Sequence, residues 1–148
     1  MPHTYVVTYV HVVFSTKGRR PLISVEAMPR LHAYLGGITR EHDTVAMEIG
    51  GVEDHVHLLL KIPATVAVAK LVQLIKGGSS KWMNGNITSD FSRQEGYGAF
   101  SVGQSQLDIT RRYILNQAEH HRTGSFQDEY RAFLTKHGIA WDEAHVWG

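Results

Sequence analysis

Two histidines separated by a single residue, His55 and His57, stand in a stretch rich in β-forming residues that continues through Leu60. Such a stretch predicts a buried β-strand. Because side chains alternate between the two faces of a strand, both imidazoles lie on one face, with roots about 6–7 Å apart. That spacing lets both rings bind one metal ion, while Val56, Leu58 and Leu60 face a core. The pattern alone is not specific, since two polar residues on an exposed strand face produce it as well.

A second set of reactive groups lies on a predicted helix over residues 105–122. Tyr113 and Gln117 are four residues apart, so they share one helical face. A phenol can attack phosphorus if it is activated and if the charge that builds on the phosphate is neutralised. A metal ion bound to the phosphate would provide the neutralisation, and the Gln117 side-chain carbonyl would be a third ligand. The alternative is an ordinary amphipathic helix with a tyrosine packed at its edge.

Seven basic residues in three groups are candidates for binding phosphate groups. They are Lys17, Arg19 and Arg20 in a loop, Lys76 and Lys81 near the end of a predicted helix, and Arg111 and Arg112 beside Tyr113. Arginine offers several donors in a geometry that matches phosphate oxygens. The formal net charge of +1 produces no strong overall field, so a polyanion would have to be bound by a local patch of this kind. A solvated turn is the alternative explanation for the loop at 15–21.

Length and composition indicate one globular domain spanning residues 1–148. The apolar fraction of 43% is ordinary, and no apolar run approaches the roughly 18 residues that a membrane-spanning helix requires. The absence of cysteine excludes a disulfide scaffold and thiol chemistry. Because the first residues also lack the pattern of a signal peptide, we expect a cytoplasmic protein with no membrane partner.

The order of the predicted elements defines a fold class. We expect strands at 4–14, 44–49, 56–60 and 97–102, and helices at 24–41, 68–83, 105–122 and 126–137. The order β-α-β-β-α-β is that of a ferredoxin-like α+β fold with an antiparallel sheet. One sheet face carries the first two helices, and an additional helix towards the C-terminus carries Tyr113. His11 follows the alternation of the first strand, and we expect it beside the histidine pair as a supporting residue.

The histidine pair and the tyrosine helix are together much more specific than either alone. They resemble the small transposases of the IS200/IS605 type and their REP-associated relatives, which are single-tyrosine members of the HUH nuclease superfamily. The resemblance rests on His55, His57, Tyr113 and Gln117, and on supporting stretches at 14–19, 76–82, 97–102 and 137–143. It extends over essentially the whole chain, with the motifs in the order found in the family.

The resemblance implies a metal-dependent enzyme that cuts and rejoins single-stranded DNA. Tyr113 would attack a phosphodiester, forming a 5′-phosphotyrosine link and leaving a free 3′-OH. His55, His57 and Gln117 would bind the divalent ion, which is usually Mg²⁺ or Mn²⁺ in this family. Two imidazoles and an amide oxygen nevertheless suit Mn²⁺, Co²⁺, Ni²⁺ or Zn²⁺ better than the hard ion Mg²⁺.

Family members act as homodimers on single-stranded DNA with hairpin ends, and the tyrosine helix of one subunit completes the site of the other. The resemblance therefore implies a site assembled in trans, in a bacterial or archaeal cytoplasm at the nucleoid. Three alternatives are a domesticated hairpin-processing nuclease of REP type, a metal-dependent phosphoesterase that uses water, and a non-catalytic module that binds single-stranded nucleic acid. The register of Tyr113 with Gln117 argues against the last, because a binding module needs no nucleophile.

Overall fold

One four-stranded antiparallel sheet organises the chain. The computed structural model describes residues 4–87, 96–122 and 124–147. Its strands are β1 (Tyr9–Ser15), β2 (Val45–Val52), β3 (His55–Lys61) and β4 (Gly98–Val102), in the order β2-β3-β1-β4 across the sheet. Helix α1 (Met28–Glu41) connects β1 to β2, and α2 (Val68–Asn86) precedes β4. The predicted ferredoxin-like α+β arrangement is confirmed.

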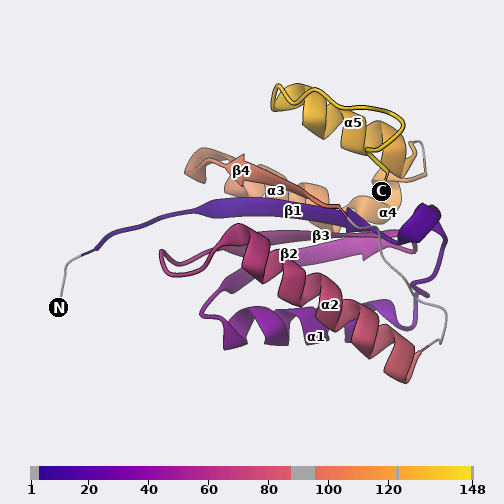
Figure 1. Cartoon of the computed structure of the whole chain (residues 1–148), viewed down its shortest axis with the longest axis horizontal. Helices are drawn as coiled ribbons and strands as arrows, with labels where there is room; N and C mark the ends of the chain where they lie inside the picture. The colour runs from indigo at the N-terminus through magenta and orange to yellow at the C-terminus, as the bar shows by residue number, and fades with distance from the viewer. Residues whose placement is uncertain (1–3, 88–95, 123, 148) are drawn as a thin grey trace.

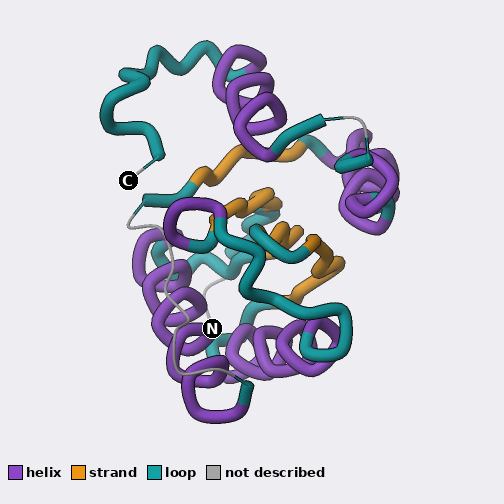
Figure 2. The backbone as a smooth tube through the Cα atoms, turned by 90° about the vertical axis from the view of Figure 1, so that its right-hand side faces the viewer, coloured by secondary structure: helices purple, strands orange, loops and turns teal. Residues whose placement is uncertain are grey.

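Helices cover both faces of this sheet. Helices α1 and α2 lie together along one face, whereas α3 (Leu107–Leu115), α4 (Gln117–His120) and α5 (Phe126–Lys136) lie on the other side, as Figures 1 and 2 show from two directions. Short 3₁₀ turns at Lys17–Arg19 and Gln104–Gln106 follow β1 and β4. Among the helices in the described ranges, none combines the length and the apolarity needed to span a bilayer.

The two faces of the central strands carry different kinds of side chain. One face enters the main core beneath α1 and α2, with Val10, Val12, Phe14, Val56, Leu58 and Leu60. The other face carries a smaller core under α5, formed by Val13, Phe100, Phe126, Tyr130 and Leu134. His11, His55 and His57 lie on this second face, and all three are buried. Strand β3 is therefore enclosed on both sides, and the histidine pair is not a polar pair on an exposed face.

Two strand boundaries differ from the prediction because of how these strands pair with their neighbours in the sheet. Strand β1 begins at Tyr9 rather than at residue 4, since Tyr9 is paired with the last residues of both neighbours, Lys61 and Val102. The segment at 4–8 lies outside the strand, as Figure 1 shows. Strand β2 continues to Val52 rather than ending at residue 49, and the turn of the β2–β3 hairpin lies at residues 53–54.

The predicted helix at 105–122 is divided at Asn116. Helix α3 ends just before this residue and α4 begins just after it, because the backbone of Asn116 leaves the helical region (φ −97°, ψ 24°). After this break, Gln117 points towards the protein interior and is only 1% exposed, whereas Leu115 is 63% exposed. Tyr113 and Gln117 are therefore presented by successive helices and not by one continuous helical face.

The position of α3 depends on the missing side chain of Gly50 in β2. A Cβ at Gly50 would lie 2.4 Å from the carbonyl oxygen of Ile114 and 2.7 Å from its Cγ2 atom. Real Cβ atoms do not approach other atoms that closely, so α3 lies directly on the backbone of the strand. Because Tyr113 precedes Ile114, this contact sets the distance of the tyrosine from the sheet.

We therefore expect Gly50→Ala to push α3 away from β2. Overpacking of this kind should lower the free energy of unfolding by about 1–3 kcal/mol, as measured by chemical denaturation. The matched control is Gly77→Ala in α2, where a Cβ meets nothing within 4 Å. That variant should be as stable as the parent or more stable by about 0.5–1 kcal/mol, because alanine favours a helix over glycine. Equal stability of Gly50→Ala and the parent would contradict the close contact.

Candidate active site

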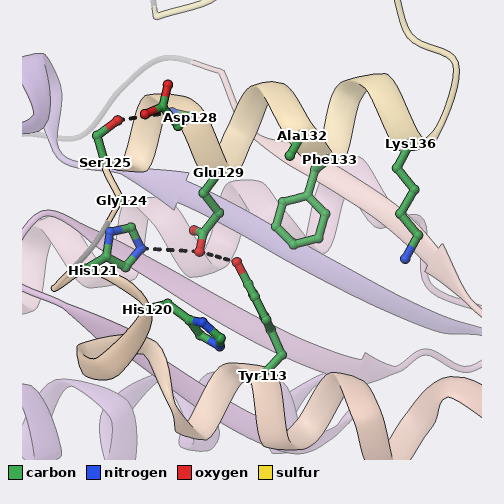
Figure 3. Close-up of a pocket in the computed structure, with 10 residues that line it drawn as sticks. All are labelled: Tyr113, His120, His121, Gly124, Ser125, Asp128, Glu129, Ala132, Phe133 and Lys136. Atoms are coloured by element: carbon green, nitrogen blue, oxygen red, sulfur yellow. Dashed lines mark hydrogen bonds and ion pairs between the residues drawn. The ribbon is translucent and has the colours of Figure 1, made fainter.

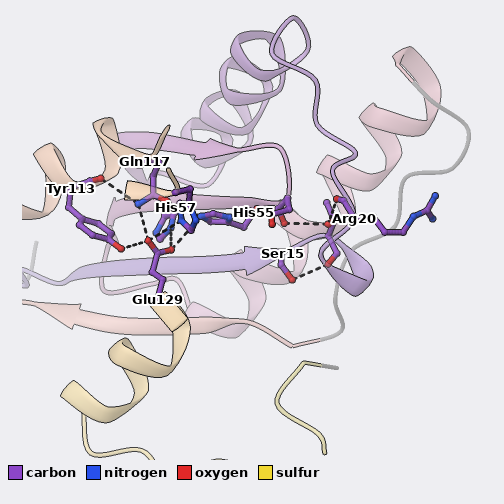
Figure 4. A network of polar contacts seen from close by, with 10 residues as sticks. Ser15, Arg20, His55, His57, Tyr113, Gln117 and Glu129 are labelled. Atoms are coloured by element: carbon purple, nitrogen blue, oxygen red, sulfur yellow. Dashed lines mark hydrogen bonds and ion pairs between the residues drawn. The ribbon is translucent and has the colours of Figure 1, made fainter. Parts of the chain in front are cut away.

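Side chains from β3, α3, α4 and α5 converge on the second face of the sheet (Figure 4), and His11 of β1 contacts this group through His57. The ring centroids of His55 and His57 are 4.9 Å apart, and the Tyr113 ring is 5.8 Å from that of His57. The Gln117 Oε1 atom lies 2.8 Å from Nε2 of His55. The structure thus brings together the four residues that the sequence suggested as nucleophile and metal ligands.

A fifth residue, Glu129 on α5, occupies the centre of this cluster. Its Oε1 atom lies 2.9 Å from Nε2 of His57 and 3.4 Å from Nε2 of His55. Its Oε2 atom accepts a short hydrogen bond from the Tyr113 hydroxyl and lies 3.2 Å from Nε2 of His121 (Figure 3). The helix at 126–137 is predicted by the sequence pattern, but neither Glu129 nor His121 is among the predicted site residues. A usable signal was present, because Glu129 interrupts the apolar face of α5.

Two further contacts orient the imidazoles. Asp54, the turn residue before β3, has its Oδ1 atom 2.7 Å from Nδ1 of His55. His11 on the neighbouring strand places Nε2 2.7 Å from Nδ1 of His57, so this residue lies where the alternation of β1 predicted. With their Nδ1 atoms engaged, both rings of the pair direct Nε2 towards the cluster. Such partners fix the ring orientation of histidines that bind metals.

The charges in the cluster follow from burial and hydrogen bonding. Burial alone would lower the pKa of His55, but its hydrogen bonds to Asp54 and Glu129 raise it to about 9. Burial lowers the pKa of His57 to about 4 and that of His11 to about 3. Burial would raise the pKa of Glu129, yet its hydrogen bonds with the histidine pair hold it well below its usual range. Without a bound ion, the cluster near neutral pH therefore pairs an ionised carboxylate with a protonated His55, and an ion bound at Nε2 would displace that proton.

The tyrosine is protonated in this arrangement. Burial raises the pKa of the Tyr113 hydroxyl, and its hydrogen bond to the carboxylate of Glu129 raises it further. The hydroxyl is therefore a hydrogen-bond donor in a fixed position, and a change in its surroundings must precede any nucleophilic attack.

The donor atoms of the cluster have the spacing of a metal coordination shell. Metal–ligand bonds of about 2.1 Å place neighbouring donor atoms about 3.0–3.4 Å apart. The distances of 2.8 Å between His55 and Gln117, 2.9 Å between His57 and Glu129, and 3.4 Å between His55 and Glu129 are close to these values. Ligand atoms of His55, His121 and Glu129 also lie within 4.8 Å of one another. This group is compatible with a divalent ion, and it does not include the predicted ligand His57.

A cavity of about 400 Å³ opens beside the cluster, between α3–α4 and α5 (Figure 3). Its lining residues are Tyr113, His120, His121, Gly124, Ser125, Asp128, Glu129, Ala132, Phe133 and Lys136. The ring of His120 stacks on that of Tyr113, with centroids 4.5 Å apart. A ligand in this cavity would meet the tyrosine and the carboxylate together with apolar surface from Phe133.

The predicted phosphate-binding residues do not gather around Tyr113. Arg111 and Arg112 line a separate cavity that also includes Glu48, and the Arg111 Nε atom lies 3.7 Å from a carboxylate oxygen of Glu48. Lys76 is buried, donates to the Gly96 carbonyl at 2.8 Å and lies over the Tyr97 ring.

The other basic residues lie elsewhere on the surface. Lys81 is exposed on α2, across the sheet from the tyrosine. In the loop after β1, Lys17 and Arg20 are exposed, whereas Arg19 lies 5.5 Å from the ring of Trp147. A DNA-binding role of these seven residues stays a prediction.

Comparison with known proteins identifies the family. The sequence profile of a family described as "Transposase IS200 like" matches residues 4–117 of this chain, which is more than half of its length. The chain belongs to the IS200-like transposase family. The match includes His55, His57, Tyr113 and Gln117, and it ends before Glu129. The predicted family is confirmed.

Individual relatives of this IS200-like transposase agree with that assignment. The transposases for insertion sequence element IS200 of Salmonella typhimurium and Salmonella typhi are each 27% identical over 121 residues, covering 77% of this chain and 79% of theirs. A crystal structure of a candidate transposase from Deinococcus radiodurans matches with a TM-score of 0.65 and 20% identity, over 79% of this chain and 95% of that one.

The REP-associated tyrosine transposase bound to a REP hairpin matches with a TM-score of 0.62 and 11% identity. That match covers 82% of this chain and 73% of the other. At these identities, the two solved structures support the fold alone.

The geometry of the cluster predicts an order of metal affinities. We expect His57→Ala to weaken Mn²⁺ binding by at least about 100-fold, since it removes a donor, and Gln117→Ala by about tenfold, since water can replace an amide oxygen. His145→Ala is the control, because this histidine is exposed and contacts Asp142. Isothermal titration calorimetry measures the three affinities. Unchanged binding in both site variants would remove the proposed metal site.

Proposed function

We propose that this transposase cuts and rejoins single-stranded DNA by transesterification, with Tyr113 as the nucleophile and a divalent ion, Mg²⁺ or Mn²⁺, as cofactor. The observation that supports the proposal best is the convergence of the Tyr113 hydroxyl and the two histidine Nε2 atoms on one carboxylate. A nucleophile and a cation site so close together suit attack on a phosphodiester, whose negative charge must be neutralised as the bond forms.

The reaction that we propose conserves the number of phosphoester bonds. The Tyr113 oxygen attacks a DNA phosphorus atom, the bond from phosphorus to the 3′-oxygen breaks, and a 5′-phosphotyrosine and a free 3′-OH result. In the second step a 3′-OH attacks the same phosphorus and releases the tyrosine, so the strands are joined without an external energy source. An ion held by His55, His57 and Gln117 would supply Lewis-acid stabilisation of the phosphate charge.

The protein's own groups have distinct parts in this proposal. Asp54 and His11 keep the two imidazoles oriented. The backbone contact between α3 and β2 holds Tyr113 at a fixed distance from the sheet. The cavity beside Tyr113 has the volume of a typical small-molecule site, and it would admit a nucleotide next to the phosphate that is cut. The ring of Phe133 offers a surface on which a base could stack.

We further propose that the DNA substrate carries a hairpin. The solved REP-associated tyrosine transposase is bound to a REP hairpin, and this chain shares its fold. The exposed basic residues Lys17, Arg20, Lys81, Arg111 and Arg112 are available for contacts with the phosphates of such a substrate.

The assembly of the site is the remaining part of the proposal. The family resemblance favoured a homodimer in which the tyrosine helix acts in trans. Within one chain, however, the Tyr113 hydroxyl already bonds to Glu129 and its ring lies beside that of His57. These contacts support a site built within each subunit, and a dimer would then join two complete sites.

The nucleophile can be tested with a conservative change. Tyr113→Phe keeps the ring and removes the oxygen, so the covalent protein–DNA adduct should fall by at least about a thousandfold on a denaturing gel with labelled single-stranded DNA and Mn²⁺. Tyr5→Phe, at an 89% exposed tyrosine, should retain full adduct formation. If Tyr113→Phe still cuts DNA at the parental rate without an adduct, the phosphoesterase alternative is correct.

Mixing two inactive variants distinguishes a cis from a trans site. Tyr113→Phe protein is mixed with a His55→Ala/His57→Ala double variant under conditions in which tagged subunits are shown to exchange. If each chain builds its own site, every site in the mixture lacks a component, and we expect cleavage to stay at background. Recovery of up to about a quarter of the parental cleavage, well above background, would establish exchange of tyrosine helices between subunits.

A further inference from the structure

Glu129 is a residue of this site that belongs to neither the histidine pair nor the tyrosine helix. It comes from α5, beyond the residues that match the family profile. Its side chain is 9% exposed. A carboxylate is costly to bury unless its oxygens are paired. All of its hydrogen-bond partners among the described residues belong to the cluster, so α5 and the reactive residues depend on each other.

The two oxygens of this carboxylate face different groups. Oε1 lies between Nε2 of His57, at 2.9 Å, and Nε2 of His55, at 3.4 Å. Oε2 accepts the hydrogen bond of the Tyr113 hydroxyl and lies 3.3 Å from the Gln117 amide nitrogen. One oxygen therefore faces the donor atoms of a metal site, and the other faces the atom that would attack phosphorus.

The fold holds Glu129 in this place from both sides. The Ser125 hydroxyl caps the start of α5 by accepting a hydrogen bond from the Asp128 N–H at 3.1 Å. Phe126, one turn before Glu129, packs its ring 4.7 Å from that of His55. Phe133, one turn after it, lies edge-on to the Tyr113 ring at 5.7 Å. A shift of α5 along its axis would break these ring contacts, so the position of the carboxylate is well determined.

We propose that Glu129 joins the metal ion to the nucleophile, with Oε1 as an additional ligand of the ion and Oε2 as the acceptor that positions the Tyr113 hydroxyl. The inference rests on the proposed function of this site and adds an anionic ligand to it. Two imidazoles and an amide oxygen favour borderline ions, whereas an added carboxylate oxygen shifts the preference towards Mn²⁺ and Mg²⁺. The carboxylate also supplies a negative charge that balances a divalent cation in a buried site.

The geometry has one competing explanation. In this second explanation, Glu129 occupies the position of the ion by contacting the two histidines, and its carboxylate would have to move away before an ion binds. The two explanations predict opposite effects on metal affinity. A ligand strengthens Mn²⁺ binding, so its removal weakens it. A blocking group competes with the ion, so its removal strengthens Mn²⁺ binding.

The first experiment measures Mn²⁺ binding without DNA, by calorimetry. We expect Glu129→Gln, which keeps the shape and removes the charge, to weaken binding by at least about tenfold, and Glu129→Asp to have an intermediate effect. The matched control is Glu119→Gln, since Glu119 is 73% exposed and pairs with Arg122. Unchanged or tighter binding in Glu129→Gln would overturn the proposal. Because no DNA is present, this result is independent of whether Tyr113 is the nucleophile.

A second measurement uses the parent protein and does not depend on how the variants fold. If Oε1 binds the ion, Mn²⁺ should slow amide hydrogen exchange in α5, residues 126–136, as well as in β3. A blocking carboxylate would be released by the ion, and exchange in α5 would become faster, which would refute the ligand role.

The positioning role has its own readout. At saturating Mn²⁺, Glu129→Gln should reduce the single-turnover rate of adduct formation by at least about tenfold, with the affinity for labelled single-stranded DNA changed less than about twofold. An unchanged rate under these conditions would leave Tyr113 positioned by other contacts and would refute this half of the proposal.

Discussion

The constraint on which this structure depends is that β3 is buried on both faces while one of those faces is polar. An antiparallel sheet commonly leaves one face to water, and a pair of histidines would be easy to place there. Here His55 and His57 are fully buried, so every ring nitrogen needs a partner. Asp54, His11, Gln117 and Glu129 provide those partners from four different places in the chain. The hydrogen-bonding needs of one strand are thus met by residues from several other parts of the chain.

Ordinary packing brings these partners into range. Gly50 removes the side chain that would keep α3 off the sheet, and Ile114 fills the space against the strand backbone. The break at Asn116 then places Gln117 at the start of a new helix, with its side chain buried in the cluster. On the other side, the small core of Phe126, Tyr130 and Leu134 seats α5 over the sheet. The reactive residues are therefore positioned mainly by backbone and apolar contacts.

The parts of this architecture that follow local rules could be predicted from the sequence. The period of two in β3 and the apolar periodicity of the first two helices led to the correct fold, and the His55/His57 and Tyr113/Gln117 patterns led to residues that do lie together. The apolar face of its helix marks Glu129 as unusual, but its partner could not be predicted, because it meets His57 across 72 positions of sequence and only the topology decides that contact. The start of β1 depended in the same way on where two other strands end. Arg111 and Arg112 show that closeness in sequence does not ensure closeness in space, since residues next to Tyr113 on its helix point in other directions.

The division of the cluster between β1 and α5 has a consequence for biosynthesis. His11 is synthesised well before Glu129, so the ribosome releases the histidine pair and the tyrosine before their last partner. A nascent chain that stops at Gln117 contains every residue of the family motif but has no helix to close over it. Loop closure across so many residues is slow, because chain entropy opposes it until the final contacts form. The cluster is therefore completed only after the segment that forms α5 has been synthesised.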